Sequence, residues 1–331
     1  MNKQLQQIIL RDELMKATRA FFAERKFTEI TPSILNDAVP NEPNIYPFIT
    51  SWDGCSERQI KYLPTSPERS LKIALGTGLG DCYAIGHSFR NLEGSGSLHS
   101  PEFLMLEWYR VQSSYQKIMK EIEEYILYVS NRLTAIQEQA SVCHAELIVY
   151  PEHRRREASR KGWTIISLKA RFEEVLGMSY EKLSTDEQTL FDVAKKLGYT
   201  VENATWRQIF DQIFVNEIES KLPKDPVFLV DFPSRISPLC KRKSDTPHIA
   251  ERFELYIQGI EIANGNNENT NVSEIREVFE KETGEGRSPL DIQFLEALQT
   301  MHDSGNNYAG VGLGLDRLLM VMMGEEEITH I

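Results

Sequence analysis

Two arginines stand where a cation could hold an anionic ligand. Arg90 closes the strand-like segment "YAIGHSFR" and precedes the glycine- and serine-rich connection "NLEGSGSLHSPE". Arg317 falls in the first turn of a helix expected after "AGVGLG", where glycines let a ligand come close to the backbone. A guanidinium binds a carboxylate or a phosphate through its planar fork. Taken alone, each arginine is equally consistent with a structural salt bridge.

Two acids form a second candidate for chemistry. The segment "ERFELYIQGIEIANGNNEN" places Glu261 and Glu268 seven residues apart, after an alternating apolar stretch that turns at Gln258-Gly259. An isolated pair of this kind is best interpreted as solvated loop acids. The alternative is that Glu261 and Glu268 belong to a functional site at the end of a hairpin, which depends on the residues that other segments of the chain contribute to it.

Periodicity predicts the elements that must position these residues. Apolar residues at helical spacing, among them Ile8, Met15 and Phe22 with Leu14 and Phe21 beside them, predict a helix with one buried stripe. Alternation predicts strands, two of which form a hairpin with a long connection. We expect helices over 4–26 and 118–136, strands over 83–90, 103–111, 227–233 and 253–257, strand character again in "IEIANG", and a last strand leading into a helix near Asp316.

Two longer stretches are interpreted more coarsely. Residues 36–60 are rich in Asn and Pro and are expected to form a loop. Residues 140 to about 222 are expected to be a mostly helical insertion, with helices over 184–197 and 205–220. The remainder, with the insertion inside it, is expected to be one domain.

Bulk composition limits the class of protein. A chain of 331 residues with 41% hydrophobic content can bury a sizeable core, and its net charge of −12 gives no general attraction to nucleic acid. Neither a secretory signal nor a bilayer-spanning run is found, so a cytoplasmic protein without a membrane partner is expected. The four cysteines lack the CxxC spacing, which indicates neither a disulfide framework nor a zinc site. A basic segment at 153–161 is either a contact for an acidic partner or a solvated helix face.

Taken together, these segments resemble a known family. The hairpin with "SFRN" and "HSPEF", and "GLGLDR" opening a terminal helix, resemble motifs 2 and 3 of class II aminoacyl-tRNA synthetases. The segment "FFAERKFTEITPSIL" is similar to motif 1, which implies a homodimer with Pro32 at its interface. With "TSPERSLK" and "ERFELYIQGIEIANG", the chain resembles the lysyl-tRNA synthetase catalytic domain, and most closely the elongation factor P lysine ligase family. The resemblance covers nearly the whole chain outside about 140–220 and implies an α+β fold, an antiparallel sheet flanked by helices.

The resemblance also implies an activity. Lysine or β-lysine would be activated with ATP and Mg²⁺ as an aminoacyl-adenylate and transferred to a protein lysine, on elongation factor P. No segment before residue 1 is expected to supply the β-barrel with which lysyl-tRNA synthetases grip the anticodon, so tRNA is not the expected acceptor. Activation accumulates negative charge, which cations must neutralise. The two ammonium groups of a lysine-like substrate require buried anions in turn.

Individual residues carry these implied roles. Arg90 and Arg317 are the catalytic cations. Glu68, with Ser66 beside it, takes the amino group nearer the substrate carboxylate, whereas Glu107, Tyr109 and Glu268 hold the far one. Glu261 coordinates the metal, which Glu268 shares. The remaining ATP contacts fall to residues of motifs 2 and 3 and of the acidic hairpin: Asn91, Glu93, His99, Phe103, Ile262 and Gly314.

The sequence departs from the family pattern at three points. Leu92 separates Asn91 from Glu93, where relatives read Arg-Asn-Glu without a break, and the distance to His99 is correspondingly longer. The basic residue that relatives place just before this histidine is missing. Gly312 stands where the ligases tend to carry alanine and the full synthetases glycine. The choice between α- and β-lysine and the acceptor stay open, as do two alternatives, a different acceptor and a weakly catalytic amino-acid-binding paralogue or dimeric interaction module.

Overall fold

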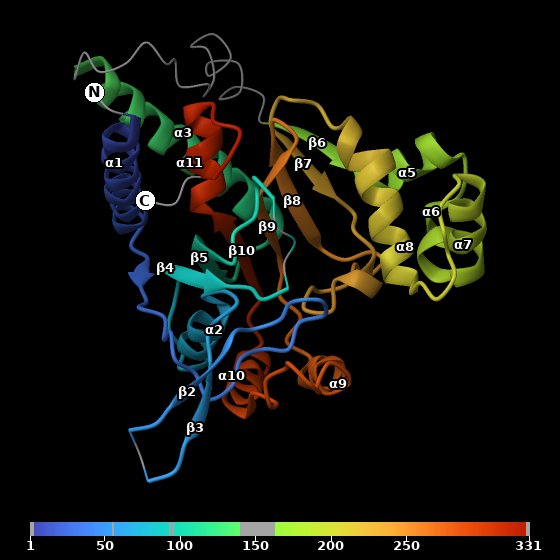
Figure 1. Ribbon diagram of the computed structural model, residues 1–331, viewed down its shortest axis with the longest axis horizontal. Coiled ribbons are helices and arrows are strands. Elements are labelled where there is room, and N and C mark those ends of the chain that lie inside the picture. Colours follow the sequence, from blue (N-terminus) through green and yellow to red (C-terminus); the bar gives the residue numbers. More distant parts are fainter. Residues whose placement is uncertain (1–2, 55, 93, 95, 140–162, 329–331) are drawn as a thin grey trace. The chain divides into compact units, whose positions relative to one another are not determined.

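The chain divides into two compact units, which Figure 1 traces in sequence colours. The computed structural model describes residues 3–54, 56–92, 94, 96–139 and 163–328. Unit 1 consists of Met1–Gly162 with Thr270–Ile331, and unit 2 is Trp163–Asn269. Both combine helices with mostly antiparallel strands, so the expected α+β class is confirmed. The basic segment at 153–161 and the first part of the expected insertion lie outside the described residues.

Four strands of unit 1 lie side by side in the order β1-β4-β5-β10. The strand β1 runs parallel to β4, whereas the pairs β4–β5 and β5–β10 are antiparallel. The hairpin expected over 83–90 and 103–111 is therefore confirmed, and the glycine-rich end of the chain supplies its neighbour. The bounds are β1 Thr28–Glu29, β4 Cys82–Phe89, β5 Glu102–Val111 and β10 Tyr308–Gly314.

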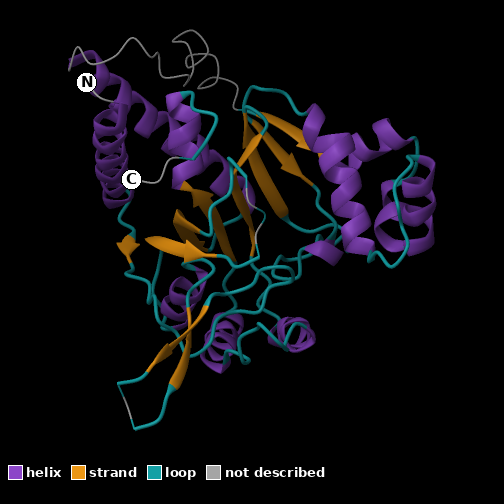
Figure 2. Cartoon of the chain, viewed as in Figure 1, coloured by secondary structure: helices purple, strands orange, loops and turns teal. Residues whose placement is uncertain are grey.

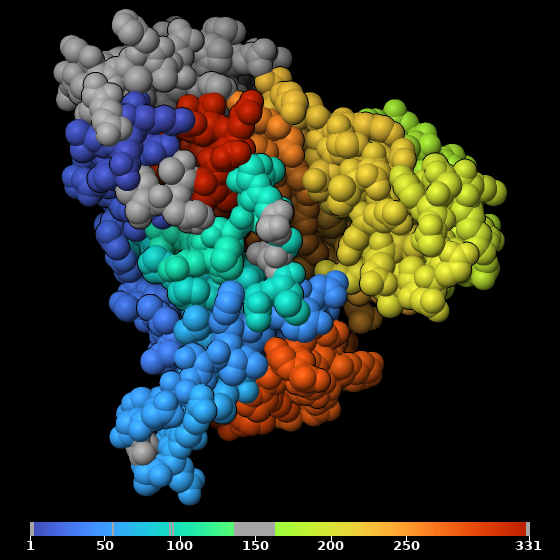
Figure 3. Space-filling view, in the orientation of Figure 1, coloured from blue at the N-terminus to red at the C-terminus, as the bar shows by residue number. Residues whose placement is uncertain are grey.

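A second, two-stranded sheet corrects the loop expected at 36–60. The strands β2 (Ile49–Trp52) and β3 (Gln59–Tyr62) pair antiparallel. Figure 3 shows this hairpin, in light blue, projecting from the body of unit 1, and it carries exposed Ile49, Trp52 and Ile60. Many Asn and Pro residues suggested a loop, but they flank the pair of strands rather than fill it.

The helices of unit 1 pack on its strands or on one another. The predicted long helices are confirmed as α1 and α3, which contact each other. Phe21 of α1 meets Tyr125 of α3 edge-on at 5.3 Å, and the neighbouring Phe22 stacks on Tyr83 of β4 at 4.4 Å and meets Trp108 of β5 edge-on at 5.3 Å. The stripe predicted for α1 is partly wrong, since Ile8 is 43% exposed although Phe22 is buried. The helix bounds are α1 Lys3–Glu24, α2 Glu68–Gly76, α3 Tyr115–Gln139, α9 Val272–Lys281, α10 Ile292–Asp303 and α11 Leu315–Met323.

Unit 2 contains four strands in the order β9-β8-β7-β6, and Figure 2 shows its helices gathered to one side of them. The helices and the strands share one apolar core. The expected helix over 205–220 ends as an α-helix at Ile213 and continues as π and 3₁₀ turns. The bounds are β6 Thr164–Ser167, α5 Leu168–Leu176, α6 Tyr180–Thr185, α7 Glu187–Lys196, α8 Trp206–Ile213, β7 Val227–Val230, β8 Arg252–Ile257 and β9 Ile260–Asn267.

No helix in the described part of the chain is both long and apolar enough to cross a bilayer.

Candidate active site

The floor of the site in unit 1 is one face of the strands β4, β5 and β10. Phe103, Met105, Glu107 and Tyr109 alternate along β5 and therefore point to the same face. The residues that pair with them on the neighbouring strands are small. On β4 these are Ser88, Gly86, Ala84 and Cys82. On β10, Gly314, Gly312 and Gly310 pair with Met105, Glu107 and Tyr109. The larger side chains of β5 therefore stand between two rows of small ones.

Glu107 and Tyr109 form a buried polar pair on this floor. The Tyr109 hydroxyl donates to Glu107 Oε1 at 2.6 Å, and the two residues are 4% and 3% exposed. A Cβ placed on Gly310 would lie 2.2 Å from Tyr109 Cε1, so the tyrosine ring occupies the space that a side chain would need. This explains the glycine at the start of "GVGLG" and fixes the tyrosine, and through it the carboxylate.

The predicted substrate residue Glu68 begins the helix α2, where a carboxylate is favoured by the helix dipole. Its backbone N–H donates to Ser66 Oγ at 3.2 Å, so the structure brings these two predicted residues together. Sequence analysis missed Lys72, one turn later, whose ammonium donates to Glu68 Oε1 at 2.5 Å. The i,i+4 spacing of the two residues in "PERSLK" was the signal that could have found it.

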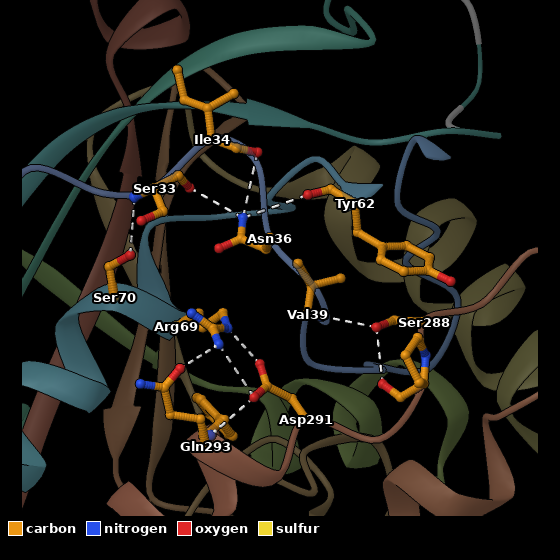
Figure 4. Close-up of polar contacts among 12 residues, drawn as sticks. Ser33, Ile34, Asn36, Val39, Tyr62, Arg69, Ser70, Ser288, Asp291 and Gln293 are labelled. Atoms are coloured by element: carbon orange, nitrogen blue, oxygen red, sulfur yellow. Dashed lines mark hydrogen bonds and ion pairs between the residues drawn. The ribbon is translucent and has the colours of Figure 1, made fainter. Parts of the chain in front are cut away.

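Contacts with α10 hold α2 in place. Arg69 binds Asp291 and donates to Gln293 Oε1 at 2.9 Å, as Figure 4 shows. Asp291 also accepts from the backbone N–H of Phe294 and thereby caps α10. Asp291 thus contacts both helices and attaches the start of α2, where Glu68 lies, to α10.

The predicted cation Arg90 follows the last residue of β4 and is half-buried. Its Nε donates to the carbonyl oxygen of Thr65 at 3.3 Å, and its guanidinium lies 5.1 Å from the centroid of the Phe103 ring. These contacts hold the side chain between the segment that leads to Glu68 and the floor strand β5. Such a position suits a cation that must meet both a carboxylate and a phosphate.

The other predicted cation, Arg317, lies in the first turn of α11, and Gly314 is the N-cap residue of that helix. The Nε of Arg317 donates to the carbonyl oxygen of Leu98, in the connection between β4 and β5. The neighbouring Asp316 accepts from the Leu104 backbone N–H and pairs with Arg11 at 2.6 Å. The motif 3 helix is therefore attached to both the motif 2 connection and α1.

The start of the motif 2 connection is held by a distant loop. The Asn91 backbone N–H donates to the Tyr46 carbonyl oxygen at 2.8 Å, and the ring of Tyr46 lies 3.8 Å below the Arg287 guanidinium. Arg287 also donates to the backbone carbonyls of Glu42 and Ile45. Arg287, which sequence analysis missed, therefore holds the loop that contains Tyr46, and this loop in turn binds Asn91.

Three predicted contacts in the motif 2 connection have different outcomes. The side chains of Asn91 and His99 are exposed. Leu92, the inserted residue, is 76% exposed and adopts a left-handed conformation, with φ of 62°. Glu93 lies outside the described residues, so its predicted contact with adenine stays a prediction.

Unit 2 presents an acidic face that depends on a bulge. The turn at Gln258-Gly259 has positive φ at both residues, which suits a two-residue hairpin. The register pairs Leu255 with Ala263 but Tyr256 with Glu261, so Ile262 is an extra residue in β9.

The bulge decides which acids share a face. In a regular strand, residues seven apart point to opposite faces. The extra residue shifts the alternation by one, so Glu261 shares a face with Asn264, Asn266 and the position of Glu268. The buried Ile262, predicted to contact ATP, is the residue that produces this arrangement.

A third acid on the same face was missed. Glu254 of β8 is buried, pairs with Arg252, and accepts from the Tyr256 hydroxyl at 2.8 Å. Burial and, to a smaller extent, the charge of Glu261 raise the pKa of Glu254 to about 7, although Arg252 opposes the shift. The alternation of Arg252, Glu254 and Tyr256 in "RFELY" was the signal that could have found it.

Glu268 follows β9 and is 6% exposed. The Asn266 amide donates to its Oε1 at 3.1 Å, and a backbone bridge joins Glu268 to Cys240. The solvated-acid interpretation is therefore wrong for Glu268, because its side chain is buried. It is also excluded for Glu261, which is half-buried and interacts electrostatically with Glu254.

The fold and these residues define the class of protein. The family model of class II tRNA synthetases (D, K and N) matches residues 1–331, and the chain belongs to this family of ligases. An antiparallel sheet, an arginine before the motif 2 connection and a glycine-rich strand opening a terminal helix are the shared features described above.

The curated relatives point to one branch of this family. The chain is 31% identical over 320 residues to an "Elongation factor P--(R)-beta-lysine ligase homolog" of Aquifex aeolicus, covering 96% of each chain. It is 30% identical to the proteins named "Elongation factor P--(R)-beta-lysine ligase" of Edwardsiella ictaluri and of Proteus mirabilis, and in both cases the alignment covers 98% of this chain and 93% of the relative. The resemblance inferred from the motifs is confirmed.

Proposed function

We propose that the protein activates lysine or β-lysine with ATP and transfers the aminoacyl group to a lysine of elongation factor P. In the first step a substrate carboxylate oxygen attacks the α-phosphorus, the bond to the β-phosphate oxygen breaks, and pyrophosphate leaves. In the second step the acceptor amine attacks the carbonyl carbon, the bond to AMP breaks, and the amine loses a proton. The observation that carries the proposal is the buried Glu107–Tyr109 pair on a floor of small residues, with Glu68 in the same unit.

The charges of unit 1 suit this substrate. Glu107 and Glu68 are anions that can each accept hydrogen bonds from an ammonium group, which an apolar or acidic side chain cannot donate. Arg90 supplies the cation for the reacting carboxylate and phosphate, and Arg317 a second one for the nucleotide. Phe103, beneath the guanidinium of Arg90, offers a ring on which adenine can stack.

Magnesium fits the acidic face of unit 2. Burial and the neighbouring Glu261 raise the pKa of Glu254, so a cation that binds both carboxylates would replace the favoured proton. Glu261 and Glu254 would hold the metal, which when bound neutralises phosphate charge as the adenylate forms. The two roles predicted for Glu268, at the far ammonium group and at the metal, remain predictions.

A homodimer is proposed on the apolar surface of α1. Leu5, Ile8 and Ile9 of this helix are 49%, 43% and 37% exposed. A second copy of the chain would cover them, in agreement with the role predicted for motif 1. A translation factor as acceptor places the reaction in the cytoplasm.

A second candidate is an amino-acid-binding paralogue with weak activation. The exposed Leu92 and its left-handed backbone favour it, because they alter the connection that would close over ATP. Transfer to an acceptor other than elongation factor P is the alternative within the first candidate.

One experiment separates these candidates. Amino-acid-dependent exchange of pyrophosphate into ATP is measured across the standard amino acids and both lysine isomers. We expect exchange with lysine or β-lysine alone, and no exchange with any of them would leave the binding paralogue. Mass spectrometry of elongation factor P after incubation with the enzyme, ATP and the active isomer then tests the acceptor, which should gain one aminoacyl group.

A further inference from the structure

Lys72 is a charged side chain that the proposed reaction does not use. It is 0% exposed, and it belongs to the small group of fully buried large side chains of the described chain. Lysine is almost never fully buried unless it is paired. Its ammonium lies 2.5 Å from Glu68 Oε1, so the cation is in direct contact with a predicted substrate residue.

Glu68 and Lys72 are not equally accessible from outside the protein. The side chain of Lys72 is 1% exposed and that of Glu68 is 12% exposed, so the surface that the pair presents belongs to the carboxylate. Behind it, the ammonium lies 5.8 Å from the centroid of the Tyr109 ring and 5.6 Å from that of Phe294. Both distances fall within the range of cation–π contacts. A ligand therefore meets Glu68 first, with Lys72 held on the far side.

One cation thus stands behind both proposed ammonium sites. It binds Glu68 directly, and it lies beside the ring of Tyr109, whose hydroxyl binds Glu107. Near the start of α2, the positive charge of Arg69 is paired with the negative charge of Asp291. Lys72 therefore offsets part of the negative charge that Glu68 and Glu107 carry.

We propose that Lys72 is a positioning residue that determines specificity for a diammonium amino acid. It holds one oxygen of Glu68 and fixes the orientation of the carboxylate, so that the other oxygen receives the substrate ammonium. This inference rests on the proposed activation of lysine or β-lysine and adds a residue to it. An uncharged side chain at position 72 would leave the carboxylate of Glu68 without the cation that orients it.

A purely structural role is the competing explanation. Replacing a buried ion pair by apolar residues of similar volume is often neutral or stabilising, so the pair is not needed for packing alone. If the role of Lys72 were structural, replacing it would change the stability of the protein and lower the exchange rate with every amino acid to the same extent. In the proposed role, replacing it changes the KM for the amino acid and leaves the KM for ATP unchanged.

The test is pyrophosphate exchange by the full-length variants Lys72→Met and Lys281→Met. Lys281 is the matched control, because it pairs with Glu277 at the same i,i+4 spacing on the surface of α9. We expect Lys72→Met to raise the KM for the active lysine isomer about 10- to 100-fold, the worth of one charge-assisted hydrogen bond, with the KM for ATP changed less than about twofold. Lys281→Met should match the unmodified protein.

Further variants keep the test decisive if Lys72→Met does not fold. Lys72→Arg retains the cation and should have a lower KM for the amino acid than Lys72→Gln. In Lys72→Met/Glu68→Gln the losses should be less than additive, because each change breaks the same ion pair. Thermal denaturation of each variant reports stability separately.

The outcomes distinguish this inference from the proposed function. An unchanged or lowered KM for lysine in Lys72→Met, or equal values for Lys72→Arg and Lys72→Gln, would overturn the role of Lys72 while activation by the unmodified protein stands. Absence of amino-acid-dependent exchange in the unmodified protein would overturn the proposed function and this inference with it.

Discussion

The two units hold their buried carboxylates in different ways. In unit 1, Glu68 has Lys72 and Glu107 has Tyr109, so each acid has a donor in contact with it. In unit 2, Glu254 shares its face with Glu261, and the pKa of Glu254 is raised to about 7 by burial and then by that second carboxylate, against the effect of Arg252. The first arrangement keeps fixed anions ready for ammonium groups. The second keeps an excess of negative charge that a bound cation would relieve.

The two units also differ in how their strands make the site. Unit 1 places small residues on both sides of β5, whereas unit 2 uses an extra residue to turn Glu261 onto the face of Glu254. Unit 1 is therefore most sensitive to added volume, and unit 2 to a change of register.

Replacing Glu261 breaks the comparison most severely. Glu261→Gln removes one of the two carboxylates proposed to hold the metal and leaves the bulge in place. Because a bound metal contributes several kcal/mol to such a reaction, we expect exchange activity to fall about 10³-fold or more. Glu280→Gln, on the surface of α9, is the control and should match the unmodified protein. Full activity of Glu261→Gln, measured over a range of magnesium concentrations, would show that Glu261 does not hold the metal.

Arg90→Ala tests the cationic side of unit 1. Removing one preorganised donor of this kind typically costs about 10²–10³ in rate. We expect pyrophosphate exchange to fall by this factor, since the guanidinium between Thr65 and Phe103 is lost. The exposed Arg276, which pairs with Glu280 on α9, provides the control Arg276→Ala. A loss below about tenfold would instead favour the structural interpretation of Arg90.

Glu268→Gln sharpens the comparison by separating ammonium binding from metal binding in unit 2. The change removes a buried anion, and we expect the KM for the lysine isomer to rise about 10- to 100-fold with little effect on ATP. Glu277→Gln on α9 is the exposed control. If the KM for ATP and the magnesium requirement rise to the same extent, Glu268 acts mainly on the metal.

Gly310→Ala and Gly312→Ala compare two neighbouring positions of unit 1. A Cβ on Gly310 would lie 2.2 Å from Tyr109 Cε1, whereas one on Gly312 would lie 3.3 Å from Met105 Sδ, the flexible part of a side chain. We expect Gly310→Ala to lower the free energy of unfolding by about 1–3 kcal/mol and to weaken lysine binding.

Gly312→Ala should have the smallest effect, below about 1 kcal/mol, because methionine adapts its shape readily. Urea denaturation and exchange with both lysine isomers measure the two effects. Similar losses in both variants would mean that the Tyr109 ring is not what requires glycine.

Local pattern determined much of the fold in advance. The hairpin of β4 and β5, the long helices α1 and α3, the turn at Gln258-Gly259 and the terminal strand leading into α11 were all predicted, and the family motifs lie on them. These elements depend on the spacing of apolar residues at period 2 or 3.6 and on turn residues, which are properties of neighbours in the chain. The same motifs named most of the candidate residues.

Tertiary structure decided the environment of those residues. The projecting hairpin β2–β3, the bulge at Ile262 and the burial of Lys72 and Glu254 were not predicted. Arg287, far along the chain, holds the loop that binds Asn91. Register, burial and charge partners depend on segments that are distant in sequence and meet only when the chain folds, so a local pattern cannot specify them. The sequence therefore named the acids and cations, and packing determined which of them are paired, buried or turned to a common face.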